Sequence, residues 1–418
     1  MHGVCIRVGS GVVRLMSVLE KMSDEAVARA LIAGHIPLAE GFRKIMASEG
    51  FPVHTAHGTC IFLFKGPRGC KVATEFDGSH LHVMKRGPGG LNYAEVWLPT
   101  QVGHKLRYGY QLPHGKRVCD PLARCFLYEN GEEVSLLRRP EGMQHLMRWD
   151  DFESPQGLKS RSIHVLVPPN AGPYDVLYAH DGQNLFSPQG ICGGWRLCEN
   201  MRRIGGDFLI VGIWNTPDRL REYTHVSDEF GDGMQESLGR KYASFVEETI
   251  RPFIECTFDT TGRAGLMGSS LGGLISLYIA SCYPGRYDSV FALSPTTAWG
   301  RFSDDHGRTI RDVYERAGHQ NTFIYIDHGG IFPAEGMPDV LDRKVALRDE
   351  AGWGSEYDNS CYTFDFVSAL VELGYRQSVD LFYEYIPGAM HNEDAWASRV
   401  SHPLRLFMKR HRESVGKS

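Results

Sequence analysis

The hydrophobic and polar positions of this chain of 418 residues form three successive patterns. In the first pattern, from about residue 17 to 48, apolar residues such as Val27 and Leu31 recur at helical spacing. Ser23 precedes them and has a side chain that can cap a helix, and Pro37 interrupts the spacing. The pattern predicts a helical N-terminal segment over residues 1–50.

The second pattern covers about residues 52 to 138 and consists of short β-rich runs, such as Thr59–Phe64 and Ala94–Leu98. Turns rich in glycine and proline separate these runs. Regular short strands without intervening helices predict a small antiparallel β-sandwich at residues 51–138.

In the third pattern, strands and helices alternate after a polar stretch at 139–158, whose prolines and glycines predict a linker. The run Asp175–His180 is apolar nearly throughout, which is typical of a strand covered on both faces. The alternation predicts the α/β fold class, with a mostly parallel sheet flanked by helices. The strand candidates are Ile163–Val167, Asp175–His180, Phe208–Ile213, Ala264–Met267, Ser289–Leu293, Thr322–Asp327 and Val379–Tyr385, and the helix candidates are Met234–Glu255, Leu271–Cys282, Tyr362–Leu373 and Asp394–Arg410.

Composition narrows the class of partner. The net charge of −5 gives no electrostatic reason to expect a nucleic acid or an anionic membrane as partner. No apolar run approaches the length of a membrane span, and the first sixteen residues show no secretory signal. The 10 cysteines include no Cys-x-x-Cys pair, so we expect a reducing, cytoplasmic setting and neither a metal nor another cofactor.

The strongest chemical signal is the Gly-x-Ser-x-Gly motif at 268–272, between a short strand and a helix of small and apolar residues. A serine on such a tight turn has a strained backbone, and the residues two before and two after it must be very small. For Ser270 these neighbours are Gly268 and Gly272, whereas for Ser269 they are a methionine and a leucine. The motif therefore predicts Ser270 as a nucleophile.

Two backbone amides are candidates for an oxyanion hole. The amide of Leu271 lies at the N-terminus of the helix that follows the serine, where it can donate to a developing negative charge. A second donor is expected just beyond the strand that ends at His180; there Gly182 permits close approach, and the Gln183 amide is the predicted donor. The favoured interpretation of His180 and Asp181 is structural, as residues that brace this loop.

The general base is expected near the C-terminal end of the chain. His391 follows the last predicted strand in a loop with a glycine, and it would take the Ser270 proton and return it to the leaving group. The acid should follow the Thr322–Asp327 strand and orient His391 through its other ring nitrogen. The candidates for this acid are Asp327, Glu335, Asp339, Asp342, Asp358 and Asp365.

These residues resemble the putative-esterase (esterase-D-like) family of α/β hydrolases, especially its enterochelin-esterase-like branch. The resemblance implies an α/β-hydrolase domain at 159–414 and, through Lys71–Gly78 and Val118–Leu122, an immunoglobulin-like module for the β-sandwich at 51–138. The stretches that carry the main resemblance are Arg161–Pro169, Val176–Phe186, Val211–Asn215, Arg219–Tyr223, Met267–Leu274, Tyr283–Tyr287, Leu293–Pro295 and Met390–Trp396.

The resemblance implies the same nucleophile, general base and oxyanion amides that the residue pattern predicts, and it also favours one of the candidate acids. Family members often end the relevant strand in Asp-x-Gly-Thr, followed by an acidic residue and a helix with a tyrosine. Here Asp327 holds the strand end, but Gly330 replaces the threonine and an insertion at 331–355 follows. The pattern resumes at Asp358, which is therefore favoured as the acid, with Asp327 second.

Two further residues are candidates for substrate binding. Arg219 follows a strand on the expected catalytic edge, where it either contacts an oxygen-rich substrate or pairs with Asp218 or Glu222. Trp195 lies in the long glycine-rich loop after the oxyanion motif, where it either lines the acyl or alcohol pocket or packs in the interior.

The sequence thus predicts a serine hydrolase that cleaves a small-molecule carboxylic ester through an acyl-serine intermediate. The resemblance suggests a siderophore lactone or an acylated sugar as substrate. A ferric catecholate is strongly anionic and would need free arginines, for which Arg202, Arg203, Arg219, Arg221 and Arg301 are candidates. An acyltransferase with the same triad and a non-catalytic binding protein on a hydrolase scaffold are the alternatives, and a homo-oligomer is compatible with the sequence.

Overall fold

The computed structural model describes residues 19, 21–99, 103, 105–231, 233–301, 308–330 and 353–415, without the side chains of 353–359 and 411–415. The chain divides into two compact units, Met1–Asp151 and Phe152–Ser418. Among the described residues, no helix combines the length and the apolar character that a bilayer crossing requires.

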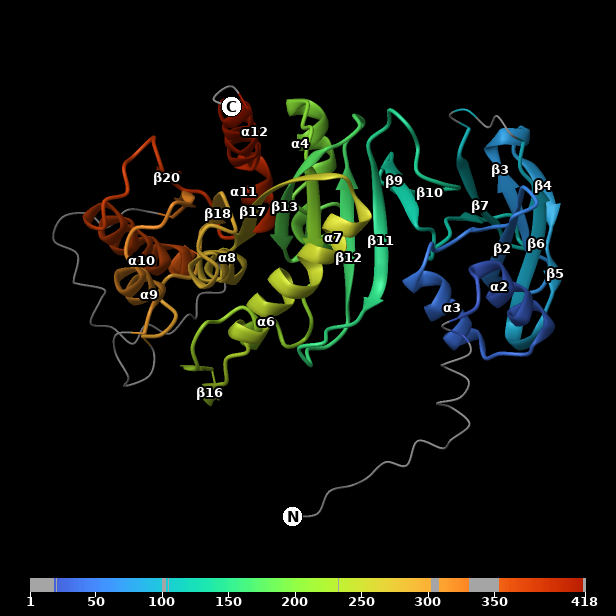
Figure 1. The fold of residues 1–418 in the computed structure, drawn as a ribbon, viewed down its shortest axis with the longest axis horizontal. Helices are drawn as coiled ribbons and strands as arrows, with labels where there is room; N and C mark the ends of the chain where they lie inside the picture. The colour runs from blue at the N-terminus through green and yellow to red at the C-terminus, as the bar shows by residue number, and fades with distance from the viewer. Residues whose placement is uncertain are drawn as a thin grey trace, which may run out of the picture. The chain divides into compact units, whose positions relative to one another are not determined.

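Two short helices, α2 (Asp24–Ala33) and α3 (Leu38–Ala47), open the described part of the first unit (Figure 1). The Ser23 hydroxyl accepts a hydrogen bond from the Ala26 N–H at 3.3 Å, so the predicted cap is confirmed. Gly34 ends α2 with a φ of 75°, a conformation that favours glycine. The helical pattern therefore folds as two helices rather than one.

The first unit has two antiparallel sheets, β1–β2–β6–β5 and β11–β9–β10–β7–β3–β4, with β8 paired to β7. This agrees with the short β-rich runs of the sequence, and the immunoglobulin-like assignment stays a prediction. The strands are β1 (Val53–His54), β2 (Thr59–Lys65), β3 (Lys71–Thr74), β4 (His80–Val83), β5 (Lys85–Arg86), β6 (Leu91–Trp97), β7 (Arg107–Gln111), β8 (Arg117–Val118), β9 (Cys125–Glu129), β10 (Glu132–Leu136) and β11 (His145–Phe152).

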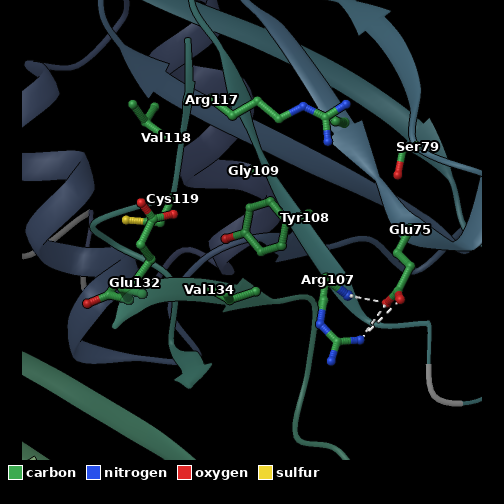
Figure 2. A pocket seen from close by; sticks show the side chains of 12 residues that line it. Glu75, Ser79, Arg107, Tyr108, Gly109, Arg117, Val118, Cys119, Glu132 and Val134 are labelled. Atoms are coloured by element: carbon green, nitrogen blue, oxygen red, sulfur yellow. Dashed lines mark hydrogen bonds and ion pairs between the residues drawn. The ribbon is translucent and has the colours of Figure 1, made fainter. Parts of the chain in front are cut away.

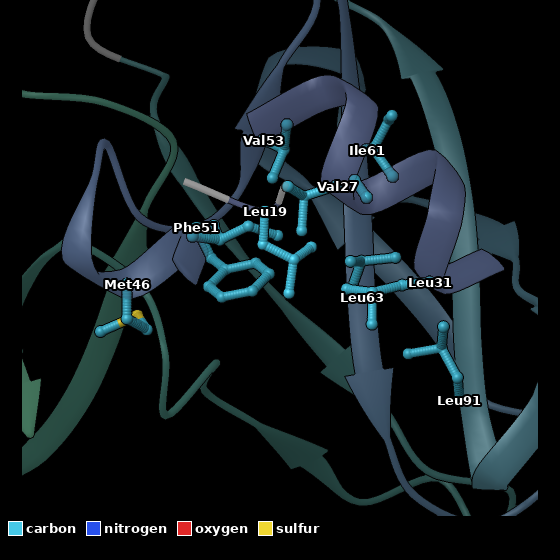
Figure 3. Packing of buried hydrophobic residues seen from close by; sticks show 11 residues of the cluster. Leu19, Val27, Leu31, Met46, Phe51, Val53, Ile61, Leu63 and Leu91 are labelled. Carbon is cyan, nitrogen blue, oxygen red and sulfur yellow. The ribbon is translucent and has the colours of Figure 1, made fainter. Parts of the chain in front are cut away.

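Strand β2 is covered on both faces. Figure 3 shows Ile61 and Leu63 of β2 buried with Val27 and Leu31 of α2, all in one apolar cluster. The residues that alternate with them in β2, such as Phe62, lie in a second buried cluster. This double burial explains why the sequence of β2 is apolar nearly throughout rather than alternating.

The structure corrects the linker predicted at 139–158, because strand β11 occupies part of it. Leu146 and Met147 of β11 pair with Phe126 and Cys125 of β9. Arg148, one of the polar residues of this stretch, is buried, and it forms an ion pair with Glu133 as well as hydrogen bonds to backbone carbonyls. The unit boundary falls directly after Asp151.

The second unit contains a mixed sheet in the order β20–β19–β18–β17–β13–β14–β12. Neighbouring strands from β20 to β14 pair in parallel, and β12 pairs antiparallel to β14. The strands are β12 (Arg161–Val167), β13 (Tyr174–His180), β14 (Leu209–Ile213), β17 (Thr260–Ser269), β18 (Ser289–Leu293), β19 (Phe323–His328) and β20 (Leu381–Tyr385), and a separate hairpin joins β15 (Asp228–Phe230) and β16 (Gly233–Gln235). The predicted α/β class is confirmed, with a mixed sheet.

Helices flank this sheet in two groups: α4 packs on α12, while α6, α8, α9 and α10 pack on one another in turn (Figure 1). The helix predicted over Met234–Glu255 is wrong in its first part, because Met234 lies in β16 and the helix begins at Gly239. The helices are α4 (Leu197–Ile204), α5 (Arg219–Glu222), α6 (Gly239–Phe245), a π-helical turn (Val246–Ile250), α7 (Arg251–Thr257), α8 (Leu271–Cys282), α9 (Ile310–Ala317), α10 (Trp353–Glu372), α11 (Glu393–Arg399) and α12 (Ser401–Val415).

Candidate active site

Ser270 lies on the sharp turn between β17 and α8. Its φ of 55° and ψ of −125° are strained for a residue with a side chain. A Cβ added to Gly268 would lie 2.4 Å from the backbone carbon of Gly272, so any larger residue would force the turn open. Ser269 is instead buried at the end of β17. The structure therefore gives Ser270, and not Ser269, the geometry that the steric argument requires.

The hydroxyl of Ser270 has a partner that the sequence did not single out. Within the described residues, Ser270 Oγ is hydrogen-bonded to Thr296 Oγ1 at 3.2 Å rather than to His391. Catalytic hydrogen bonds are often long in the absence of substrate and tighten later, so this geometry leaves His391 eligible as the base. The one signal for Thr296 in the sequence is its position just beyond β18, the neighbour of β17.

His391 is half-buried in the loop between β20 and α11. This loop is fastened to the end of β19, because Gly330 and Ala389 share a backbone hydrogen bond of 2.9 Å, and a Cβ on Gly329 would collide with Ala389. The imidazole ring contacts the ring of Trp396 edge to face, with centroids 5.1 Å apart. The loop and Trp396 together fix the position of the ring.

Several contacts bring the sequence-predicted segments together. The loop that follows β13 and carries Gln183 is called the oxyanion loop below, and the loop that carries His391 is called the histidine loop. In the oxyanion loop, Asn184 donates to Glu393, two residues beyond His391, at 3.0 Å. The nucleophile turn also lies close to this loop: a Cβ on Gly272 would lie 3.3 Å from the Cβ of His180, the residue at which β13 ends and the oxyanion loop begins. The nucleophile turn, the oxyanion loop and the histidine loop therefore meet at the same edge of the sheet.

The two predicted oxyanion donors lie at a helix N-terminus and in a short 3-10 turn. Leu271 is the first residue of α8, so its N–H has no acceptor within the helix and adds to the positive end of the helix dipole. Gln183 is in a single 3-10 turn that Asp181 begins with a φ of 57°. Gly182 is required there, because a Cβ would lie 2.6 Å from the backbone carbon of Gly212 in β14.

The structure corrects the expected partner of Arg219. Its guanidinium pairs with Asp181 through two hydrogen bonds of 2.7 and 2.8 Å. The two residues predicted as its partners are engaged elsewhere, since Glu222 forms a fully buried pair with Arg161 and Asp218 pairs with Lys159. Arg219 thus braces the oxyanion loop, an interaction that neighbouring sequence could not reveal.

His180 is buried beneath the same loop. Burial lowers the pKa of its imidazole to about 3, so the ring is neutral near pH 7. Its Nδ1 is hydrogen-bonded to the Tyr242 hydroxyl at 2.9 Å. The bracing role predicted for His180 and Asp181 agrees with these contacts.

The candidate acids differ in their surroundings. Asp327 is fully buried, and Arg399 donates to both of its oxygens at 3.0 Å, while the Ser294 N–H donates at 3.1 Å. Asp365 pairs with Arg311. The side chain of Asp358, in α10, lies outside the described residues, as do Glu335, Asp339 and Asp342.

Trp195 is 2% exposed, and its ring packs on Trp396 with centroids 6.0 Å apart. Because Trp396 contacts His391, the tryptophan pair supports the histidine from within the protein. The packing interpretation of Trp195 therefore has direct geometric support, whereas substrate contact through this buried ring has none.

The first unit contains a cavity of about 330 Å³ lined mainly by polar side chains (Figure 2). Its charged residues largely pair with each other or with neighbours, as Arg107 does with Glu75 and Glu129. Across the described residues, no three His, Cys, Asp or Glu side chains gather closely enough to hold a metal ion.

Residues 157–331 match the family model described as putative esterase. This segment of the chain is similar to that esterase family. The chain is also similar to an uncharacterised protein, YbbA, of Bacillus subtilis, with 29% identity over 150 residues, which are 32% of this chain and 56% of that protein. The chain therefore spans little more than half the length of this curated relative.

Two solved structures are similar at low identity. The ferric enterobactin esterase from Salmonella typhimurium is 15% identical, covers 86% of this chain and 96% of its own, and has a TM-score of 0.45. The IroE-like serine hydrolase from Shewanella oneidensis is 18% identical, covers 63% of this chain and 80% of its own, and also has a TM-score of 0.45. At such values we draw nothing from them about substrate.

Proposed function

We propose that the second unit, Phe152–Ser418, hydrolyses carboxylic esters through an acyl-enzyme on Ser270. The observation that carries this proposal is the strained turn of Ser270 at the N-terminus of α8, where a side chain on Gly268 would collide with the backbone of Gly272. The meeting of this turn with the oxyanion loop and the histidine loop supports it further.

In the proposed reaction, Ser270 Oγ attacks the carbonyl carbon while its proton passes to His391. The carbonyl electron pair moves onto the oxygen, where the Leu271 and Gln183 amides donate to the oxyanion. His391 then protonates the leaving alcohol, the carbon–oxygen bond of the ester breaks, and water repeats the sequence to release the acid. Asp358 remains the proposed orienting acid, because the oxygens of Asp327 are already engaged by Arg399.

For the substrate, we favour an ester of low charge, such as an acylated sugar, over a ferric catecholate lactone. Arg219 is neutralised by Asp181, and Arg221 by Glu236. Arg202 has Glu199 within 3.8 Å and also donates to a backbone carbonyl. Three of the five arginines considered for an anionic substrate thus already have partners.

The test is labelling with a fluorophosphonate probe together with turnover of a panel of esters. We expect the wild-type protein to be labelled and to hydrolyse at least one ester, and we expect Ser270→Ala to lose both properties while unfolding at nearly the same temperature. An unlabelled wild-type protein would indicate a binding protein on this scaffold. Acyl transfer to an added sugar in place of hydrolysis would indicate the acyltransferase.

A further inference from the structure

The nucleophile has a second hydroxyl at hydrogen-bond distance. Thr296 Oγ1 lies 3.2 Å from Ser270 Oγ, where either group can donate, and both residues are half-buried. We propose that Thr296 is a further catalytic residue, whose hydroxyl donates to Ser270 Oγ during ester cleavage. This inference rests on the proposed function of the second unit.

The fold holds these two residues against each other. Strand β18 pairs in parallel with β17, and Ser269 lies opposite Leu293, so the segments that follow the two strands leave the sheet side by side. The Ser270 N–H donates to the Leu293 carbonyl at 3.0 Å, and the Thr296 N–H donates to the Ser270 carbonyl at 3.1 Å. The two backbone segments that carry these hydroxyls are therefore hydrogen-bonded to each other.

Packing and side-chain shape restrict the contact further. A Cβ on Gly273 would lie 3.0 Å from the Cβ of Pro295, so the segment that carries Thr296 lies tightly on the first turn of α8. The next residue, Thr297, is buried and bonded to Thr363 at 3.2 Å. Since a threonine is also stiff about its first side-chain torsion, the Thr296 hydroxyl has few alternative positions.

A donor at this position serves both halves of the reaction. During acylation, a hydrogen bond donated by the Thr296 hydroxyl to Ser270 Oγ leaves the serine's own proton free to pass to His391 and directs an Oγ lone pair at the ester carbon. During deacylation, the bond between Oγ and the acyl carbon breaks, and Oγ takes up that electron pair. Thr296 then stabilises the developing negative charge until His391 returns a proton, and Thr296 keeps its own proton throughout.

Two variants separate the hydroxyl from the rest of the side chain. Thr296→Val keeps the shape and removes the donor, and we expect kcat/KM for a hydrolysed ester to fall about 10- to 100-fold with little change in KM. The rate of inactivation by a fluorophosphonate should fall in parallel, because this reagent reports on the nucleophile itself. Thr296→Ser keeps the donor and should retain most of the activity.

Thr297→Val is the matched control, since it removes the neighbouring hydroxyl, which is bonded to Thr363 and not to Ser270, and it should lower kcat/KM far less than Thr296→Val does. The proposal is overturned if Thr296→Val keeps the wild-type kcat/KM and inactivation rate. It is also overturned if Thr296→Ser loses as much activity as Thr296→Val, because the methyl packing would then be responsible. Full activity of Ser270→Ala would instead refute the proposed function, and this inference with it.

Discussion

Arg219 holds the carboxylate of Asp181 by two hydrogen bonds, of 2.7 Å from Nε to Oδ1 and 2.8 Å from Nη2 to Oδ2. Asn215 adds a third donor to the same carboxylate at 2.6 Å, and its backbone N–H donates to Gln183 Oε1 at 3.2 Å. The turn that carries the proposed oxyanion donor is thus tied to the segment after β14. Its geometry depends on a charge pair that lies outside the proposed catalytic triad.

Removing this pair should affect stability and catalysis together. Arg219→Ala leaves the nearly buried Asp181 carboxylate without its cation, and we expect the free energy of unfolding to fall by about 1–3 kcal/mol. Because the Gln183 amide loses its support, kcat should fall more than KM rises. Arg219→Lys keeps the charge but cannot form both hydrogen bonds, so its stability and kcat should lie between those of the wild type and Arg219→Ala. Urea unfolding and steady-state kinetics measure both effects.

Arg221→Ala is the control for this pair, because Arg221 forms an exposed pair with Glu236, whose side chain is 75% exposed. Its effect on the free energy of unfolding should stay within about 0.5 kcal/mol. If Arg219→Ala raises KM and leaves kcat intact, Arg219 contacts the substrate instead of positioning the loop.

The two candidate acids should respond differently to the same chemical change. Asp358→Asn should lower kcat by about 10²–10⁴-fold with little change in stability, because an asparagine misorients the histidine. Asp327→Asn weakens a buried pair with Arg399, so it should mainly lower the free energy of unfolding, by about 3–5 kcal/mol. Kinetics and thermal unfolding of both variants decide the assignment. A stable but inactive Asp327→Asn beside an active Asp358→Asn would reverse it.

Stability should depend on three buried histidines. Burial lowers the pKa of His180 to about 3 and those of His145 and His225 to about 4. In the unfolded chain these imidazoles have a pKa of about 6.5, so below that pH the unfolded state binds more protons than the folded state. Their contribution is therefore fully present above about pH 6.5 and is lost as the pH falls towards 4.

Urea unfolding at several pH values between about 6.5 and 4.5 measures this dependence. His145→Gln removes one of the three groups and should make the decrease of the free energy of unfolding shallower. His114→Gln, at an exposed position, is the control and should follow the wild-type curve. An unchanged slope for His145→Gln would show that this histidine does not contribute.

Local constraints could be predicted from the sequence, and distant ones could not. The helix Leu271–Cys282 and the strand Ser289–Leu293 have the predicted bounds, because a glycine-flanked turn and a short apolar run are local patterns. The helix predicted from Met234 was wrong, since apolar spacing does not distinguish a hairpin from the start of a helix. The stretch that contains β11 was predicted as a linker from its prolines and glycines, because the strand that β11 pairs with lies elsewhere in the chain.

The sequence by itself determined which serine lies on the turn, because the crowding that excludes any residue larger than glycine acts within two residues of Ser270. Only the tertiary structure decided what surrounds that serine. Thr296 reaches it from 26 positions away through the pairing of two parallel strands, and Arg219 finds Asp181 across 38 positions. Such contacts depend on strand order and loop packing, which no short stretch of sequence encodes.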